Sequence, residues 1–156
     1  MERIQSFSVN HLNLLSGLYV SRKDSFNGVV VTSFDLRITA PNREPVIDIP
    51  ALHTIEHLGA TFLRNSAEKE KVVYFGPMGC QTGFYLLTRD CDDITVYNVV
   101  ISVLEKIISY DGEMFGASRK ECGNYKNLDL SCAKAECKKY LEALRERGAD
   151  FKYPEE

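Results

Sequence analysis

Two of the three histidines in this 156-residue chain lie in one segment, Ile49-Pro50-Ala51-Leu52-His53-Thr54-Ile55-Glu56-His57-Leu58-Gly59-Ala60. His53 and His57 are four residues apart, and residues at this spacing share one face of a helix. Both imidazoles are therefore placed to bind one metal ion. Glu56 points the same way, so its carboxylate can move protons beside that metal.

The residues around the two histidines support a helix. At about 100° per residue, one apolar stripe contains Leu52, Ile55, Gly59, Phe62 and Leu63. The neighbouring stripe contains His53, Glu56, His57, Ala60 and Arg64. Pro50 suits the first helical turn, and Asp48 is placed to cap it. One face is thus predicted to anchor the helix while the next presents the ligands, although two surface histidines can also share this spacing by chance.

A strand is predicted before this helix, over residues 29–39. Phe34, Leu36 and Ile38 alternate with polar residues, which is the period of a strand with one buried face. Arg37 then lies on the polar face, either as a functional residue or as a solvated arginine. Residues 40–45 form a loop because they contain two prolines and an asparagine.

After the helix, residues 72–75 and 84–88 are predicted as short strands around a glycine-rich turn at 76–83. This pattern favours an antiparallel pair with Cys80 near its bend.

Two more helices follow, and residues 1–20 receive no firm assignment. Helical periodicity begins at Asp92 or Asp93 and continues to about residue 110, and a last helix extends from Ser131 as its cap to about residue 147, where Gly148 ends it. The elements together predict an α+β fold over residues 1–156, a single domain in which an antiparallel sheet packs with helices.

Composition excludes several classes of protein. The net charge is −3 and no basic run is present, which argues against nucleic-acid binding. No apolar run approaches the ~20 residues of a membrane span. Residues 1–6 lack the pattern of a signal peptide, so we expect a cytoplasmic protein. The five cysteines are odd in number and contain no Cys-x-x-Cys pair, which favours free, metal-bound or catalytic thiols over disulfides.

A catalytic metal centre needs about three protein ligands and one open position. The two histidines supply two ligands, and a thiolate or carboxylate is the sensible third. Cys122 precedes a glycine and Cys80 lies in the glycine-rich bend, so either sulfur is accessible to a metal. Cys132 and Cys137 lie in the last predicted helix and are expected to be packing residues or bystanders. Periodicity alone leaves the choice between Cys80 and Cys122 open.

Three separated motifs resemble one known family. They are His53-Thr54-Ile55-Glu56-His57, Pro77-Met78-Gly79-Cys80-Gln81-Thr82-Gly83-Phe84-Tyr85-Leu86 and Cys122-Gly123-Asn124, and they resemble the S-ribosylhomocysteine lyases, which produce autoinducer-2. The likeness extends through Phe34-Asp35-Leu36-Arg37 and Ala40-Pro41-Asn42, and more weakly to Ser6-Phe7 and His11. It covers most of the chain, in order and at the expected spacing.

The chain departs from the family pattern at three places. Asn10 stands where the family usually has Asp, and Gly17-Leu18-Tyr19-Val20 stands where it usually has Ala-Pro-Tyr-Val. Gly76 replaces a common Ser. The metal and acid/base positions are unaffected, so the departures concern the substrate contacts of the first 20 residues.

The resemblance implies a role for each motif residue. It makes His53, His57 and Cys122 the metal ligands and Glu56 and Cys80 the acid/base pair, and it places Ser6, His11 and Arg37 against the substrate. It also implies a homodimer with active sites at the interface, and one divalent metal per subunit. That metal is expected to be Fe(2+), replaceable by Zn(2+) or Co(2+).

The implied reaction converts S-ribosylhomocysteine to homocysteine and 4,5-dihydroxy-2,3-pentanedione, by carbonyl migration followed by β-elimination. One alternative is a metallopeptidase of the inverted His-x-x-Glu-His type, in which Glu56 activates water and a downstream carboxylate is the third ligand. The downstream sequence offers no clear motif for that ligand. A second alternative is a non-catalytic metal-binding or regulatory protein, which would not need Cys80 and Glu56 beside the metal.

Overall fold

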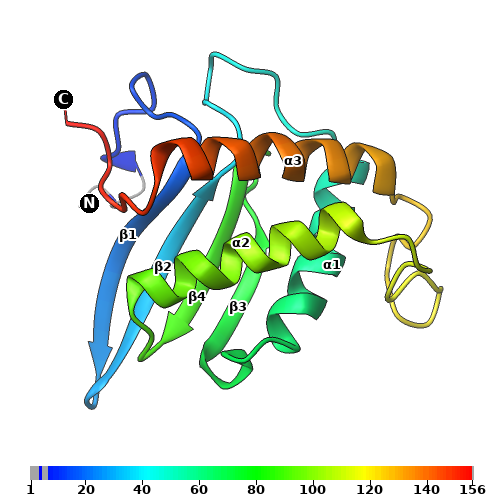
Figure 1. Ribbon diagram of the computed structural model, residues 1–156, viewed down its shortest axis with the longest axis horizontal. Helices are drawn as coiled ribbons and strands as arrows, with labels where there is room; N and C mark the ends of the chain where they lie inside the picture. Colours follow the sequence, from blue (N-terminus) through cyan, green and yellow to red (C-terminus); the bar gives the residue numbers. More distant parts are fainter. Residues whose placement is uncertain (1–3, 5–6, 156) are drawn as a thin grey trace.

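An antiparallel sheet and three helices make up the fold in the computed structural model, which describes residue 4 and residues 7–155 (Figure 1). The strands are β1 (Gly17–Phe26), β2 (Val29–Arg37), β3 (Val72–Pro77) and β4 (Gly83–Arg89), and the helices are α1 (Ile49–Arg64), α2 (Asp93–Ser109) and α3 (Leu130–Arg147). A 3-10 turn at Lys69–Lys71 precedes β3. The strand order is β1-β2-β4-β3. The predicted α+β class with an antiparallel sheet is confirmed.

The predicted helices are present, with one correction to their caps. Pro50 lies in the first turn of α1, and Asp48 occupies the cap position without a side-chain cap hydrogen bond. The cap of α3 is Asp129 rather than Ser131, because the Asp129 carboxylate accepts a hydrogen bond from the Cys132 N–H at 2.9 Å. Gly148 follows α3 with φ 73°, a conformation that glycine adopts readily.

Strand β1 was not predicted, and its exposure explains why. Only its first three residues are buried, and the remainder forms an exposed hairpin with β2. Asn27 and Gly28 make the turn between them with φ 51° and 85°. Positive φ at both central residues is typical of the tightest hairpins. The strand therefore follows from its pairing with β2 rather than from alternating hydrophobicity.

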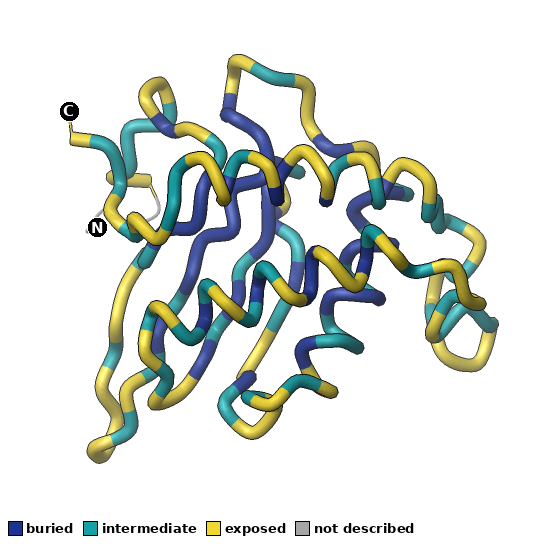
Figure 2. Tube along the Cα trace, viewed as in Figure 1, coloured by how far each residue is buried: buried dark blue, intermediate teal, exposed yellow. Residues whose placement is uncertain are grey.

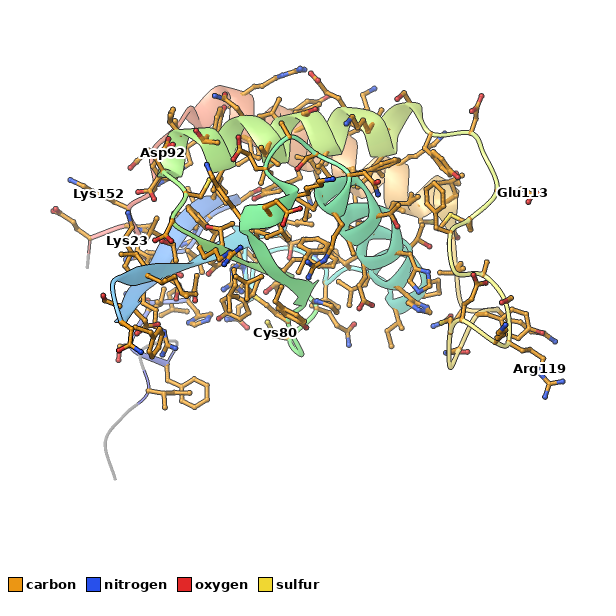
Figure 3. The ribbon with its side chains drawn as sticks, turned by 90° about the horizontal axis from the view of Figure 1, so that it is seen from below. Lys23, Cys80, Asp92, Glu113, Arg119 and Lys152 are labelled. Atoms are coloured by element: carbon orange, nitrogen blue, oxygen red, sulfur yellow. The ribbon has the colours of Figure 1, made fainter. Side chains whose placement is uncertain are left out.

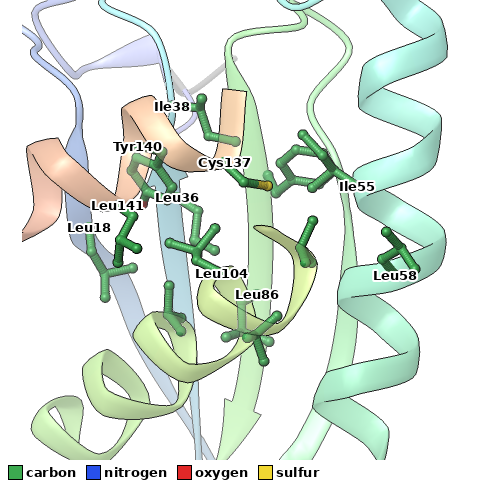
Figure 4. Packing of buried hydrophobic residues seen from close by; sticks show 14 of the residues in the cluster. Leu18, Leu36, Ile38, Ile55, Leu58, Leu86, Leu104, Cys137, Tyr140 and Leu141 are labelled. Carbon is green, nitrogen blue, oxygen red and sulfur yellow. The ribbon is translucent and has the colours of Figure 1, made fainter. Parts of the chain in front are cut away.

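The helices cover one face of the sheet. Phe34 and Leu36 of β2 and Phe84 and Leu86 of β4 point toward them and form one apolar core with residues of α1, α2 and α3 (Figure 4). Figure 2 shows the buried positions along the central strands and the inner sides of the helices. Burying one large apolar side chain contributes about 1.5–3 kcal/mol, so this layer holds the fold together.

The opposite face of β2 is also buried toward its end, which corrects the interpretation of Arg37 as a solvated strand arginine. Asp35, Arg37 and Thr39 are 1%, 3% and 0% exposed. Arg37 is buried because Asp35, two residues away on the same face, supplies a carboxylate for its guanidinium. Of the helices in the described residues, none has the length and apolarity that a membrane crossing requires.

Candidate active site

Helix α1 and a distant loop together form a candidate metal centre. The His53 and His57 rings lie 4.6 Å apart, centroid to centroid, on one face of α1. The Cys122 Sγ atom, from the loop between α2 and α3, lies 3.4 Å from His53 Nε2. One ligand atom from each of the three residues lies within 4.8 Å of the others. The structure thus brings together the three residues that the motifs single out.

Two backbone carbonyls determine which ring nitrogens face the centre. His53 Nδ1 lies 2.9 Å from the Asn127 carbonyl oxygen, and His57 Nδ1 lies 2.7 Å from that of Phe115. A carbonyl only accepts, so each Nδ1 is the donor in its bond, and Nε2 is the ring nitrogen left to bind a metal. Metal-bound histidines are commonly oriented by such a bond at the other nitrogen. The donor set of two imidazoles and one thiol therefore fits a divalent transition metal.

The loop that carries Cys122 is attached to α1 by further contacts. The Asp129 N–H donates to Thr54 Oγ1 at 2.8 Å, one residue after His53. The Phe115 ring packs edge-on against Phe62 of α1, with centroids 6.1 Å apart. These contacts hold both ends of the loop against the helix face that presents the imidazoles.

Helix α1 in turn lies very close to strand β3. A Cβ atom at Gly59 would come within 2.5 Å of the Phe75 ring, which itself stacks on Phe84 at 4.9 Å. Glycine is required for this approach, since any side chain would displace Phe75. The contact sets the position of α1, and so of His57, relative to the sheet.

A second cluster surrounds Cys80. The Arg37 guanidinium binds the Asp35 carboxylate through Nε at 3.1 Å and one terminal nitrogen at 2.7 Å. Its other terminal nitrogen donates to Thr82 Oγ1 at 2.6 Å and lies 3.9 Å from Cys80 Sγ. The Thr82 hydroxyl is 3.1 Å from the same sulfur. An arginine, a hydroxyl and a thiol therefore meet at one point.

This environment favours the thiolate form of Cys80. Burial raises the pKa of the Cys80 thiol, but hydrogen bonds from Thr82 and the charge of Arg37 outweigh it and lower the pKa overall. Burial lowers the pKa of Arg37, but the Asp35 carboxylate raises it overall, so the guanidinium keeps its charge. Cys80 itself is exposed.

The bend that carries Cys80 is closed by backbone hydrogen bonds. The Met78 N–H donates to the Gly83 carbonyl and the Gln81 N–H to the Met78 carbonyl, both at 2.9 Å. Gln81 has φ 60°, in the left-handed region. The Thr82 carbonyl accepts from the Ile38 N–H at 3.0 Å, which ties the bend to the end of β2. The thiol is therefore presented on a fixed turn.

A cavity of about 380 Å³ opens beside the thiol. Its walls include Cys80, Arg37, Asp35, His11, Tyr85 and Tyr153. His11 and Arg37, two of the three predicted substrate contacts, thus lie at the same cavity. The third, Ser6, lies outside the described residues.

Asn10 supports the turn that carries His11. Its side-chain oxygen accepts a hydrogen bond from the Leu12 N–H at 3.0 Å. An aspartate makes the same turn with its carboxylate oxygen. The departure at Asn10 therefore preserves the local backbone.

The two clusters lie apart within one chain. None of the three candidate metal ligands is among the described residues that line the cavity beside Cys80. Figure 3 shows Cys80 on the side of the sheet opposite α2 and α3. Glu56 lies between the histidines on α1, and within the described part of the chain its carboxylate makes no hydrogen bond or ion pair.

Sequence reasoning missed three residues of the second cluster, Asp35, Thr82 and Tyr153. Asp35 carried a usable signal, because a carboxylate two residues from an arginine on a strand shares its face. Thr82 stood in a recognised motif but received no role. Tyr153 carried none, since only tertiary structure brings it to the cavity.

Known proteins match this chain over nearly all its length. A model of the family S-ribosylhomocysteinase (LuxS) matches residues 4–150. The S-ribosylhomocysteine lyase of Finegoldia magna is 52% identical over 157 residues, covering 99% of this chain and 100% of the relative. The enzyme of that name from Clostridium acetobutylicum is 50% identical over 160 residues, with 99% and 100% covered. The chain belongs to the S-ribosylhomocysteinase family.

Proposed function

We propose that the protein is a metal-dependent lyase that cleaves S-ribosylhomocysteine to homocysteine and 4,5-dihydroxy-2,3-pentanedione, the autoinducer-2 precursor. The observation that carries this proposal is the convergence of His53, His57 and Cys122, within 4.8 Å of one another, in a chain of this family. A metallopeptidase is not favoured, because the third group beside the histidines is a thiol rather than a carboxylate.

His53, His57 and Cys122 are the proposed ligands of one divalent metal per subunit. We take Fe(2+) as the native ion, with Zn(2+) or Co(2+) as substitutes, since imidazole and thiolate ligands suit these metals. When bound, such an ion supplies Lewis-acid stabilisation of negative charge on the sugar oxygen, worth several kcal/mol. Metal analysis of protein purified without oxygen tests the assignment, and metal-free protein with full activity contradicts it.

Cys80 and Glu56 are the proposed acid/base pair. Carbonyl migration requires a proton to leave one sugar carbon and another to arrive at its neighbour. The Cys80 thiolate is suited to take and return such protons, because Thr82 and Arg37 lower its pKa. The Glu56 carboxylate, beside the histidines, is suited to serve the oxygen atoms. General acid–base help of this kind typically contributes ~10²–10⁴-fold.

Ser6, His11 and Arg37 are the proposed substrate contacts. His11 and Arg37 line the same cavity as Cys80, which supports their role. We also place the protein in the cytoplasm, in keeping with five cysteines that are all free.

We further propose a homodimer that shares its active sites across the sheet face free of helices. That face has a hollow of about 420 Å³ beside Tyr74 and Tyr85, and Tyr74 is 52% exposed. The Cys80 cavity includes Tyr85 and contains no metal ligand, so a second copy on this face would complete it. Light scattering of Tyr74→Asp tests the interface. We expect dimer and activity to be lost together, and a fully active monomer contradicts a shared site.

The activity is tested by thiol release on adding S-ribosylhomocysteine to iron-loaded protein, detected with a thiol-reactive dye. We expect metal-dependent release of homocysteine by the wild type. Cys80→Ala should abolish turnover and leave the metal content unchanged, whereas Cys132→Ser, on the exposed surface of α3, should retain both. Normal turnover by Cys80→Ala would contradict the proposed mechanism.

A further inference from the structure

The segment after α3 returns to the sheet and ends at the cavity beside Cys80. The Val20 N–H donates to the Phe151 carbonyl at 2.9 Å, and the Phe151 ring packs edge-on against Phe34 with centroids 6.5 Å apart. Two residues later, the Tyr153 ring stacks on Tyr19 at 4.9 Å with an interplanar angle of 14°. One backbone hydrogen bond and two ring contacts therefore fix the direction of the Tyr153 hydroxyl.

That hydroxyl is the third donor to a buried carboxylate. Tyr153 donates to Asp35 Oδ2 at 2.9 Å, while Arg37 binds both oxygens of Asp35 through two of its nitrogens. The third guanidinium nitrogen does not bind Asp35 and instead faces Thr82 and Cys80. The hydrogen bonds thus form a continuous relay from Tyr153 through Asp35 and Arg37 to the thiol.

We propose that Tyr153 is a positioning residue for Cys80: its hydroxyl orients the Asp35 carboxylate, which aims the Arg37 guanidinium at the thiol. The role of the aimed thiol rests on the proposed lyase function. The family model matches residues 4–150 and so does not include Tyr153, whose role is argued from its contacts.

The geometry explains why one hydroxyl matters. Asp35 is 1% exposed, so loss of the Tyr153 hydroxyl leaves a buried carboxylate short of one donor, and we expect it to turn toward its remaining partner. Arg37 would turn with it, because the two are joined by parallel hydrogen bonds. The Arg37 nitrogen already lies 3.9 Å from Cys80 Sγ, at the limit of a sulfur contact, so a small rotation removes it.

Few other charges compete at this site. Among the described residues, the titratable and charged groups that line the cavity beside Cys80 are Arg37 and Asp35 on β2, Tyr85 on β4, His11 before β1 and Tyr153 itself. Burial and the Asp35 carboxylate raise the pKa of Tyr153, so its hydroxyl stays protonated and remains a donor at neutral pH. Ser21 also hydrogen-bonds the Tyr153 hydroxyl, which further restricts its rotation.

Comparing Tyr153→Phe with Tyr97→Phe in the full-length, metal-loaded protein tests the proposal. Tyr97 also touches Phe151 and also donates one hydrogen bond, to the Leu144 carbonyl at 3.1 Å, but lies outside the relay. The first readout is the rate at which iodoacetamide alkylates Cys80, followed by mass spectrometry of its peptide between pH 6 and 9. The second is kcat and KM over the same range.

For Tyr153→Phe we expect alkylation of Cys80 at pH 7 to slow by about threefold, which corresponds to a rise of ~0.5 in its pKa. The kcat at pH 7 should fall similarly and recover at higher pH, with little change in KM. Tyr97→Phe should match the wild type. In an Asp35→Asn background, Tyr153→Phe should have no further effect, because it acts through that carboxylate.

Unchanged alkylation in Tyr153→Phe overturns the proposal, and so does an equal loss in Tyr97→Phe, which would indicate packing alone. The alkylation assay needs no substrate. It therefore gives its answer even if the wild type releases no homocysteine, an outcome that would count against the proposed function instead.

Discussion

His53 Nε2 lies 3.4 Å from Cys122 Sγ, although 69 residues separate the two in the chain. The carbonyls of Phe115 and Asn127 bind the two imidazoles from the same loop, so the sulfur and both rings are held as one unit. A metal at this point would join α1 to a loop that otherwise depends on a few polar contacts and ring packing.

Replacing Cys122 with Ser should abolish stable metal binding. We expect affinity to weaken by at least about 100-fold, because loss of a ligand exceeds the effect of losing a supporting residue. Metal content per chain after gel filtration, measured by mass spectrometry, checks this. Cys132→Ser should keep its metal. Full metal retention in Cys122→Ser would favour the peptidase arrangement with a carboxylate ligand.

Thr82→Val should raise the pKa of the Cys80 thiol, because it removes a hydrogen bond that favours the thiolate. Activity that needs the thiolate rises with pH through this pKa, so the acidic limb of the kcat/KM profile should move to higher pH. We expect kcat/KM at pH 7 to fall about three- to tenfold, which corresponds to a shift of the limb by ~0.5–1 pH units. An unmoved limb would contradict the assignment.

Thr88→Val is the matched control for that experiment. Thr88 is buried like Thr82 and lies on β4, and its hydroxyl has no hydrogen-bond partner among the described residues. Its removal should leave the pH profile as in the wild type.

Gly59→Ala should destabilise the fold, since its Cβ would lie 2.5 Å from the stacked ring of Phe75. We expect a loss of about 1–3 kcal/mol in the free energy of unfolding, typical of an overpacked core. Urea denaturation measures it. Gly79→Ala, whose Cβ meets no atom of the described residues within 4 Å, should remain within about 0.5 kcal/mol of the wild type.

Asn10→Asp should leave kcat/KM within about twofold, because either side chain accepts the hydrogen bond from the Leu12 N–H. Asn10→Ala loses that bond and should loosen the turn that holds His11. A cost of about 1 kcal/mol corresponds to roughly a fivefold lower kcat/KM. Equal activity in Ala and Asp variants would show that the turn does not support catalysis.

Sequence patterns predicted the helices and strands that are defined by residues close together in the chain. Helix α1 and the β3–β4 pair follow from periodicity and turn residues within one window of sequence. Strand β1 did not, because most of it is exposed and its partner β2 defines it. The choice of Asp129 over Ser131 as a cap also lies beyond such patterns, since both residue types cap helices well.

The candidate site likewise contains a part that the sequence predicted and a part that it did not. The metal cluster was predicted from the motif and the family resemblance because spacing on one helix brings two ligands together. The burial of Arg37 was not, since Thr82, which binds it, comes from the bend after β3, and Tyr153 reaches the site through Asp35. Alternation along a strand shows which residues share a face, but not what covers that face.

The residues of the relay that ends at Cys80 are synthesised far apart in time. Asp35 and Tyr153 are 118 residues apart, so Asp35 is synthesised on the order of ten seconds before the donor that completes its hydrogen bonds. A chain with residue 153 still inside the exit tunnel has its thiol and arginine but not the hydroxyl that donates to Asp35. Completion of this hydrogen-bond network therefore waits until residue 153 has left the tunnel.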